Sequence, residues 1–177
     1  RFRNVTGVQT CALPIFEINV PRDIARQILR HRSFSFQEFS QRYADPTKEL
    51  SFELREARLQ DTKNRQNSIE TDNKELDAEW KIKQVNLIAE AKNAYDWAIE
   101  NGIAKELARV VLPEGNTMSK LYMNGNLRSW ITYIALREKN GTQKEHQEVA
   151  KECKKIICDN FPSISNALGN VETDWIL

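Results

Sequence analysis

The residues of this chain that could do chemistry are above all its arginines. A dense cationic cluster, Arg-His-Arg at residues 30–32, follows Gln27 and precedes Arg42. Arg109 and Arg137 each follow an apolar pair, and an arginine in such surroundings is often partly buried and then needs an anionic or carbonyl partner. Because the planar guanidinium forms paired hydrogen bonds with phosphates and bases, the pattern is typical of a nucleotide site built from side chains. Structural salt bridges with the many acidic residues explain it equally well.

A polar run directly after this cluster could form a wall of the same site. If residues 38–43 are extended, Glu38, Ser40 and Arg42 share one face of the strand and the alternate residues share the other. Three hydrogen-bonding side chains in a row would suit a ligand. A solvated strand face is the alternative, and for a random sequence it is the better one.

Other catalytic and metal-binding patterns are missing from the sequence. The two histidines, His31 and His146, are far apart and form no H-E-x-x-H motif, which argues against a metal site. His146 stands among Lys, Glu and Gln residues, so we expect it to be exposed to solvent. No glycine-rich phosphate loop and no G-x-S-x-G motif occurs. The 3 cysteines indicate the free thiols of a cytosolic protein rather than a disulfide framework.

Length and composition limit the class of protein further. The chain has 177 residues, which fits one domain, and 26 basic against 25 acidic residues leave a net charge of +1. This near-neutral balance argues against a general nucleic-acid-binding protein, which would carry a basic excess. No apolar run approaches the roughly 20 residues of a membrane-spanning helix. We therefore expect a cytoplasmic protein that acts neither on nucleic acid nor in a membrane.

Hydrophobic periodicity predicts the elements that position these residues. Residues 1–15 resemble a translated sequencing adaptor and are left out of the fold prediction, although an ordinary N-terminal strand would explain them too. Alternation over residues 16–20 predicts a strand. The residues after it predict a helix to about His31 that buries Ile24 and Ile28. Residues 45–74 are polar and charged and predict a helix fragment and a loop.

The next part of the chain is predicted to be helical. A helix opens with a capping box at Asp72 and Glu75 and ends at Asn101-Gly102. Its buried stripe is predicted to consist of Val85, Ile88, Ala91, Tyr95, Ala98 and Ile99. A short helix follows and stops before Pro113.

Two further helices are predicted in the last third of the chain. After a turn at Asn124-Gly125, a helix runs from about residue 126 to residue 137, and its stripe of two aromatic residues between polar ends suits a pocket wall. The stripe consists of Asn126, Trp130, Tyr133 and Arg137. A capping box at Thr142 and Glu145 opens a last long helix, which breaks at Pro162. A few strands among several helices predict an α+β fold.

Several motifs, in one order along the chain, resemble those of the flavin-dependent thymidylate synthases. The matching segments are residues 30–40 (R-H-R-x7-S), 38–43 (E-x-S-x-R-Y), 106–113 (E-x-A-R-x-x-L-P), 126–129 (N-x-R-S), 136–137 (L-R) and 143–145 (the end of A-Q-x-E). The resemblance extends from residue 16 to about residue 165, and the polar middle segment matches least.

The resemblance implies a complete activity and assembly. Members of this family make dTMP from dUMP, with methylenetetrahydrofolate as the one-carbon donor and FAD reduced by NADPH as the hydride source. It implies a homotetramer in which each active site takes residues from more than one subunit, and an α/β fold with a twisted sheet and packed helices. These enzymes use no cysteine nucleophile, and this chain has no P-C-Q-like motif.

Position by position, the resemblance also implies the site residues. The residues implied for the dUMP site are Gln27, Ile28, Leu29, Arg30, Glu38, Phe39, Ser40, Gln41, Arg42, Arg109 and Arg137, of which residues 38–42 would come from a neighbouring subunit. Those implied for the FAD site are Arg30, His31, Arg32, Glu38, Asn126, Leu127, Arg128 and Thr132. We choose Arg137 as the catalytic residue, because a fixed cation beside the uracil lowers the pKa of the ring and makes C5 a better nucleophile. Ser40 has no evident base beside it and is assigned to hydrogen bonding.

The chain departs from the family at its beginning. The family's N-terminal part carries an H-x-S/T-P-F-E-H-like segment that contributes to the FAD site, and the adaptor-like residues stand in its place. We therefore expect this chain to be a fragment of a family member. Two other functions stay open: a non-catalytic fragment that only assembles with other subunits, and a nucleic-acid-binding module that uses the cationic residues 30–42.

Overall fold

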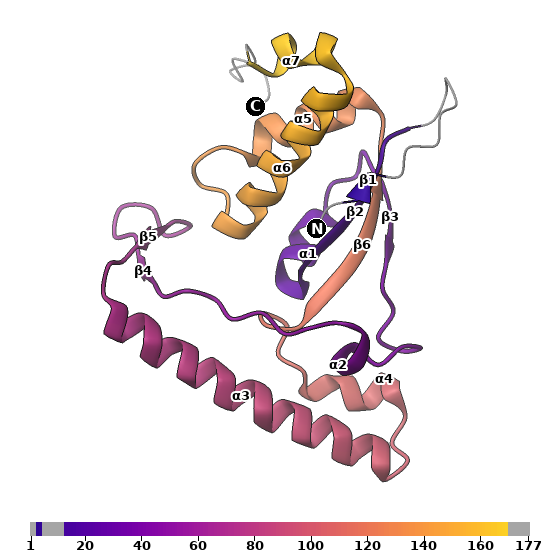
Figure 1. The fold of residues 1–177 in the computed structure, drawn as a ribbon, viewed down its shortest axis with the longest axis vertical. Coiled ribbons are helices and arrows are strands. Elements are labelled where there is room, and N and C mark those ends of the chain that lie inside the picture. Colours follow the sequence, from indigo (N-terminus) through magenta and orange to yellow (C-terminus); the bar gives the residue numbers. More distant parts are fainter. Residues whose placement is uncertain (1–2, 5–12, 170–177) are drawn as a thin grey trace.

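A four-stranded antiparallel sheet forms the centre of the fold in the computed structural model, which describes residues 3–4 and 13–169 (Figure 1). Its strands, in spatial order, are β1 (Arg3–Asn4), β2 (Ile15–Pro21), β6 (Met118–Asn124) and β3 (Ser35–Glu38). β2 and β6 pair over their full length, from Ile15 opposite Asn124 to Pro21 opposite Met118. The predicted strand is therefore confirmed, and its alternation buries every second side chain.

The segment that resembles a sequencing adaptor takes part in this sheet. Arg3 and Asn4 pair with Glu17 and Phe16 of β2, and Ile15 is the first residue of that strand. Residues 1–2 and 5–12 lie outside the described part of the chain. That residues 1–15 are an artefact stays a prediction.

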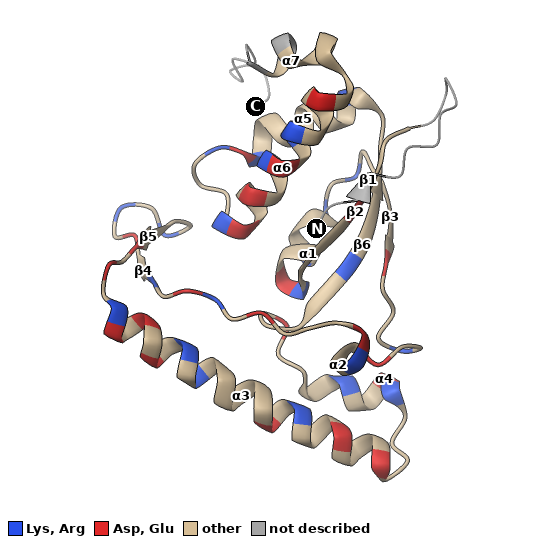
Figure 2. Ribbon diagram, in the orientation of Figure 1, with Lys and Arg blue, Asp and Glu red and all other residues tan. Residues whose placement is uncertain are grey.

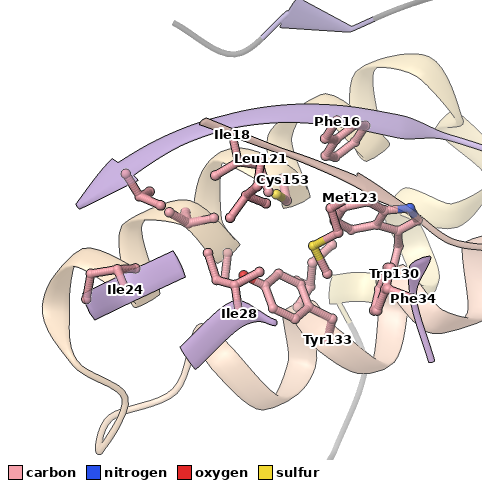
Figure 3. Close-up of a cluster of buried hydrophobic side chains, with 14 of the residues drawn as sticks. Phe16, Ile18, Ile24, Ile28, Phe34, Leu121, Met123, Trp130, Tyr133 and Cys153 are labelled. Atoms are coloured by element: carbon pink, nitrogen blue, oxygen red, sulfur yellow. The ribbon is translucent and has the colours of Figure 1, made fainter. Parts of the chain in front are cut away.

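Helices cover one face of the sheet and enclose the main core (Figure 1). They are α1 (Arg22–Ile28), α5 (Leu127–Arg137), α6 (Lys144–Asn160) and α7 (Pro162–Gly169). The aromatic rings of Phe34, Trp130 and Tyr133 pack edge to face between the sheet and α5 (Figure 3). The Asn126 side chain caps α5 by accepting a hydrogen bond from the Ser129 amide at 2.8 Å. α5 and α6 lie where the sequence predicts them, α1 ends three residues early, and α7 was not predicted.

The long helix α3 (Lys74–Glu100) lies apart from the sheet (Figure 1). Its second half buries Tyr95 and Ala98 against α4 (Lys105–Ala108) and the 3₁₀ turn η1 (Arg109–Val111). Its first half is mostly exposed, and Val85, predicted to be buried, is 49% exposed. Helical periodicity identifies an apolar stripe but not whether another element covers it. The cap was also predicted wrongly, because Asn73 and not Asp72 accepts a hydrogen bond from the Leu76 amide.

Residues 55–61 are extended, and the one helix that the structure has within residues 45–74 before α3 is short. They lead from the short α2 (Pro46–Glu49) into a hairpin of β4 (Arg58–Gln60) and β5 (Ser68–Glu70). Arg55 pairs with Asp23 at 2.6 Å and with Glu145 at 3.3 Å, and Arg58 also pairs with Glu145. These ion pairs to distant segments hold the chain extended, which local propensity does not predict. The helix α6 begins after Gln143 with no side-chain capping bond, so the predicted capping box at residues 142–145 does not form.

The described residues contain no helix that is long and apolar enough to cross a membrane. Within residues 3–4 and 13–169, no three His, Cys, Asp or Glu side chains come together in a way that could hold a metal ion. Cys153, which is buried, and Cys158 are free thiols, and Cys11 lies outside the described residues.

Gly125, between β6 and α5, has no room for a side chain. A Cβ there would lie 2.3 Å from Cδ1 of Phe34, whose ring is held against Trp130 with a centroid distance of 4.8 Å. We expect Gly125→Ala to lower the free energy of unfolding by about 1–3 kcal/mol, because the Phe34 ring must shift within a packed core. Urea denaturation measures this. Gly115→Ala is the matched control, since a Cβ at Gly115 meets nothing within 4 Å, and equal losses in both variants would contradict the close contact.

Candidate active site

The structure gathers about half of the predicted site residues into two groups. The Arg137 group lies beyond the C-terminal end of α1 and consists of Gln27, Arg30, His31, Tyr133, Arg137 and His146. The Arg109 group lies beside the N-terminal half of α1 and consists of Arg22, Glu38, Gln41, Arg42, Glu106 and Arg109. Among the described residues no hydrogen bond or ion pair joins the two groups. The two groups are connected through α1, which carries Arg22 of one and Gln27 of the other.

In the Arg137 group, the half-buried Arg137 guanidinium is oriented by a histidine. Nε of Arg137 donates a hydrogen bond to Nε2 of His31 at 2.9 Å. This contact requires a neutral imidazole, because only an unprotonated nitrogen accepts. Burial, with the positive charges of Arg137 and Arg30, lowers the pKa of His31 to about 4. His31 is therefore neutral at pH 7 and can fix the plane of the guanidinium without repelling it.

His146 is fully buried, so the prediction that it is exposed is wrong. Its Nε2 lies 3.1 Å from the Tyr133 hydroxyl, and its Nδ1 lies 3.4 Å from Oε1 of Gln27. Burial above all, with the charge of Arg137 next, lowers the pKa of His146 to about 3. A sequence signal for this position exists, because His146 continues the buried stripe of Ala150, Cys153 and Ile157 backwards at helical spacing. The charged neighbours of His146 concealed that stripe.

The Arg109 group lines a cavity of about 400 Å³. Arg22, Arg26 and Arg109 face it together with Gln41, which is 4% exposed. The amide nitrogen of Gln41 is buried and has no hydrogen-bond partner among the described residues. A buried donor without a partner is costly, so the cavity is suited to a ligand that brings acceptor oxygens.

The extended conformation predicted for residues 38–43 is wrong beyond Glu38. The strand β3 ends there, and the amides of Tyr43 and Ala44 both donate to the Ser40 carbonyl at 3.2 Å, which forms a turn. Consequently Gln41 points inward while Tyr43 is 81% exposed, although alternation would have placed them on one face. Arg42 pairs with Glu106 at 2.9 Å, and Arg109 donates through Nε to the Glu106 carbonyl at 3.3 Å.

Arg22 belongs to this group, although the sequence analysis did not single it out. It is 8% exposed and lies 3.6 Å from the Glu38 carboxylate, which also accepts a hydrogen bond from Ser119 at 2.8 Å. Burial lowers the pKa of Arg22, and the Glu38 charge opposes that effect. No local pattern marks Arg22, because its partner Glu38 lies on another element.

A larger cavity, of about 490 Å³, lies between the β4–β5 hairpin and the start of α6. It contains none of the predicted site residues. The unpartnered Gln41 donor and the oriented Arg137 place the candidate active site at the two arginine groups instead.

The chain is similar in sequence to proteins of one family. The sequence model of the family described as thymidylate synthase complementing protein matches residues 8–163. The chain belongs to the flavin-dependent thymidylate synthase family. A protein of Paramecium bursaria Chlorella virus 1 named probable flavin-dependent thymidylate synthase is 47% identical over 165 residues, which is 93% of this chain and 73% of that protein. The flavin-dependent thymidylate synthase of Synechocystis is 47% identical over 86% of this chain and 69% of its own length.

The fold agrees with this family assignment. The solved structure of a UMP/dUMP methylase, PolB from Streptomyces cacaoi bound with 5-Br UMP, superposes with a TM-score of 0.75. The superposition covers 88% of this chain and 72% of that one, at 24% sequence identity. The predicted mixture of helices and sheet is therefore confirmed, and so is the predicted family.

The residues expected to hold the family's flavin lie mostly around the start of α5. The tight contact of Gly125 with Phe34 brings this helix end next to the loop that carries Arg30 and Arg32. Arg30, Arg32 and Arg128 are exposed and have no ion-pair partner in the described part of the chain. Free guanidinium groups suit the diphosphate of a dinucleotide, so this donor set fits FAD.

Three other predicted flavin residues are placed differently. Asn126 uses its side-chain oxygen to cap α5, and Thr132 donates its hydroxyl to the Arg128 carbonyl at 3.0 Å. Both side chains retain capacity for a further hydrogen bond. Glu38 lies with the Arg109 group, three residues along β3 from Ser35, and is paired with Arg22. Within one chain, Glu38 therefore does not join the cluster at the start of α5.

The two buried histidines make the stability of the fold dependent on pH. Their folded pKa values, about 4 for His31 and about 3 for His146, lie below the value of 6.5 expected when the chain unfolds. Below pH 6.5 the unfolded chain therefore binds more protons than the folded chain, and this contribution to stability is lost as the pH falls. We expect the free energy of unfolding to decrease by about 2 kcal/mol between pH 6.5 and 5.5.

Urea denaturation at both pH values measures this decrease. His146→Leu removes one of the two groups, so it should reduce the decrease to about half. An unchanged pH dependence in that variant would contradict the neutral, buried state of His146.

Proposed function

We propose that this protein converts dUMP to dTMP as a flavin-dependent thymidylate synthase. In this proposal methylenetetrahydrofolate supplies the one-carbon unit, and NADPH reduces the FAD that supplies the hydride. Membership of the family supports the reaction, and the observation that carries the assignment to residues is Arg137, whose Nε is held by the neutral ring of His31 at 2.9 Å.

Arg137 is the residue that would activate the pyrimidine. Its Nε is occupied by His31, which leaves the two terminal nitrogens to donate hydrogen bonds to a ligand. Placed beside the uracil ring, the guanidinium stabilises the ionised ring and so lowers its pKa, which makes C5 a better nucleophile. Because Arg137 is half-buried, this attraction is weakened less by water than it would be at the surface.

The Arg109 group would bind the phosphate of dUMP. Its cavity presents the Arg109 guanidinium and the unpartnered Gln41 amide, from which phosphate oxygens can accept, whereas Arg22 and Arg26 pair with Glu114. The Ser40 hydroxyl, with Phe39 and Arg42 beside it in the same turn, would add hydrogen bonds rather than act as a nucleophile. The part of the site that holds the pyrimidine ring of dUMP would be lined by Gln27, Ile28, Leu29 and Arg30.

We propose a homotetramer in which the Arg137 group of one subunit faces the Arg109 group of another. What supports this arrangement is that, among the described residues, no hydrogen bond or ion pair joins the two groups within one chain, although a single nucleotide must meet both. FAD would bind between the two groups. It would be held by Arg30, His31, Arg32, Asn126, Leu127, Arg128 and Thr132 of one subunit and by Glu38 of a neighbouring subunit. FAD would supply the hydride, and the protein side chains would position it and the nucleotide.

The structure gives no observation that favours a nucleic-acid-binding module. Cationic residues 30–42 divide between the two groups, and acidic and basic residues alternate along α3 and α6 (Figure 2). The cytoplasmic location stays a prediction.

The first test is the reaction itself, with Arg137 as the residue varied. We expect the purified protein to carry a yellow chromophore and to form dTMP only when NADPH and the folate are both present. Arg137→Ala should reduce turnover by about 10³-fold or more with flavin retained, because the cation beside the ring is lost. Arg65→Ala, at the exposed hairpin tip, is the control and should keep full activity. Full activity of Arg137→Ala would remove Arg137 from this role.

A second test asks whether two subunits share one site. Arg109→Ala and Arg137→Ala should each be inactive, the first through loss of dUMP binding. Co-expressed in equal amounts, they should recover about one quarter of the wild-type activity, because one site in four then takes both intact arginines from different chains. Activity that stays absent in the mixed oligomer would show that both arginines come from the same chain.

A further inference from the structure

We propose that His146 is a positioning residue that holds the side-chain amide of Gln27 in its nucleotide-binding orientation. This inference rests on the proposed function, in which Gln27 lines the dUMP site. His146 lies on α6 and Gln27 on α1, so the contact joins two elements of the core. His146 itself is fully buried and would not touch the nucleotide.

The donors and acceptors around His146 form one directed chain. Oε1 of Gln27 can only accept, so Nδ1 of His146 must carry the ring proton that it donates across 3.4 Å. Nε2 is then the acceptor, and the Tyr133 hydroxyl donates to it at 3.1 Å. At the other end, Nε2 of Gln27 donates to Oε1 of Gln143 at 2.7 Å. The neutral ring, with one donor and one acceptor, satisfies both neighbours.

This chain determines which end of the Gln27 amide is oxygen and which is nitrogen. His146 occupies one lone pair of the oxygen, and Gln143 accepts from one N–H of the nitrogen. One lone pair and one N–H remain for a ligand, at fixed places. A flipped amide would exchange them, and a pyrimidine ring, whose polar edge also has donors and acceptors at fixed places, would then meet the wrong partners. The flipped state would also set Oε1 of Gln27 against Oε1 of Gln143 and would require His146 to carry its ring proton on Nε2 and donate it to the Tyr133 hydroxyl.

Tyr133 extends the arrangement toward the catalytic group. Its ring packs edge-on against His31 at a centroid distance of 4.9 Å, and His31 accepts the hydrogen bond from Arg137. Tyr133 is also buried, and burial raises the pKa of its hydroxyl, which therefore stays a donor at neutral pH. An apolar residue at position 146 would leave the Tyr133 hydroxyl and the Gln27 oxygen without a partner, and unpaired polar groups in a core favour rearrangement.

Three variants of His146 separate positioning from packing. The amide nitrogen of Asn reaches about where Nδ1 of His lies, and that of Gln reaches about where Nε2 lies. His146→Asn therefore keeps a donor for Gln27, His146→Gln keeps a group only for Tyr133, and His146→Leu keeps neither. All three are compared at equal flavin content and at temperatures below their unfolding transitions.

The expected kinetic result is a change in KM rather than in kcat. His146→Leu and His146→Gln should raise the KM for dUMP about tenfold, because one oriented hydrogen bond is lost, with kcat within about twofold of wild type. His146→Asn should restore the KM to within about threefold of wild type. Equal KM values in the Asn and Gln variants would overturn the proposal, because a packing role does not distinguish them.

A second measurement keeps this inference separate from the proposed function. In ¹⁵N-labelled protein without nucleotide, the side-chain NH₂ of Gln27, assigned by its absence in Gln27→Met, should exchange slowly with solvent. That protection should be lost in His146→Leu and His146→Gln and recovered in His146→Asn. Protection that depends on His146 in a protein that makes no dTMP would refute the proposed function alone. Normal dTMP formation with Gln27 protection unaffected by all three variants would refute the positioning role alone.

Discussion

The pairing of β2 with β6 is the constraint on which the rest of this structure depends. The strands pair along their whole length, and α1 follows β2 directly while the cap of α5 lies two residues after β6. The register of the pair therefore decides where Gln27 and Arg137 stand relative to each other. A slip of one residue would turn Phe16, Ile18 and Val20 away from the helices and expose them. The large cost of that exposure holds the register, and with it the geometry of the candidate site.

Neutral histidines fix the orientation of the side chains in the Arg137 group. A protonated imidazole would repel a guanidinium, but burial keeps both His31 and His146 uncharged at pH 7. Each can then offer one nitrogen as an acceptor, His31 to Arg137 and His146 to Tyr133. Arg137 therefore stays charged while its guanidinium is held in one orientation. In the proposed role beside a pyrimidine ring, such a cation would not have to reorient during the reaction. The same burial makes this arrangement sensitive to acid.

Different elements of the chain position the two arginine groups. The Arg137 group is positioned by α5 and α6, whereas the Arg109 group depends on η1, the turn after β3 and the start of α1. Because α1 contributes to both groups, with Arg22 in one and Gln27 in the other, its rigid backbone fixes where one group lies relative to the other.

The sequence by itself determined the elements that depend on local forces. Alternation over residues 16–20, the Asn126 cap and the apolar spacing of α6 each act within a few residues, so β2, α5 and α6 lie where they were predicted. The motifs that resemble those of the thymidylate synthases identified the family, because the residues of each motif and the order of the motifs are visible in the sequence without the fold. Tertiary structure decided the extended chain at residues 55–61 and the partners of the buried His146. Both depend on side chains from distant segments, and a polar side chain becomes stable in a core where the fold brings such partners to it.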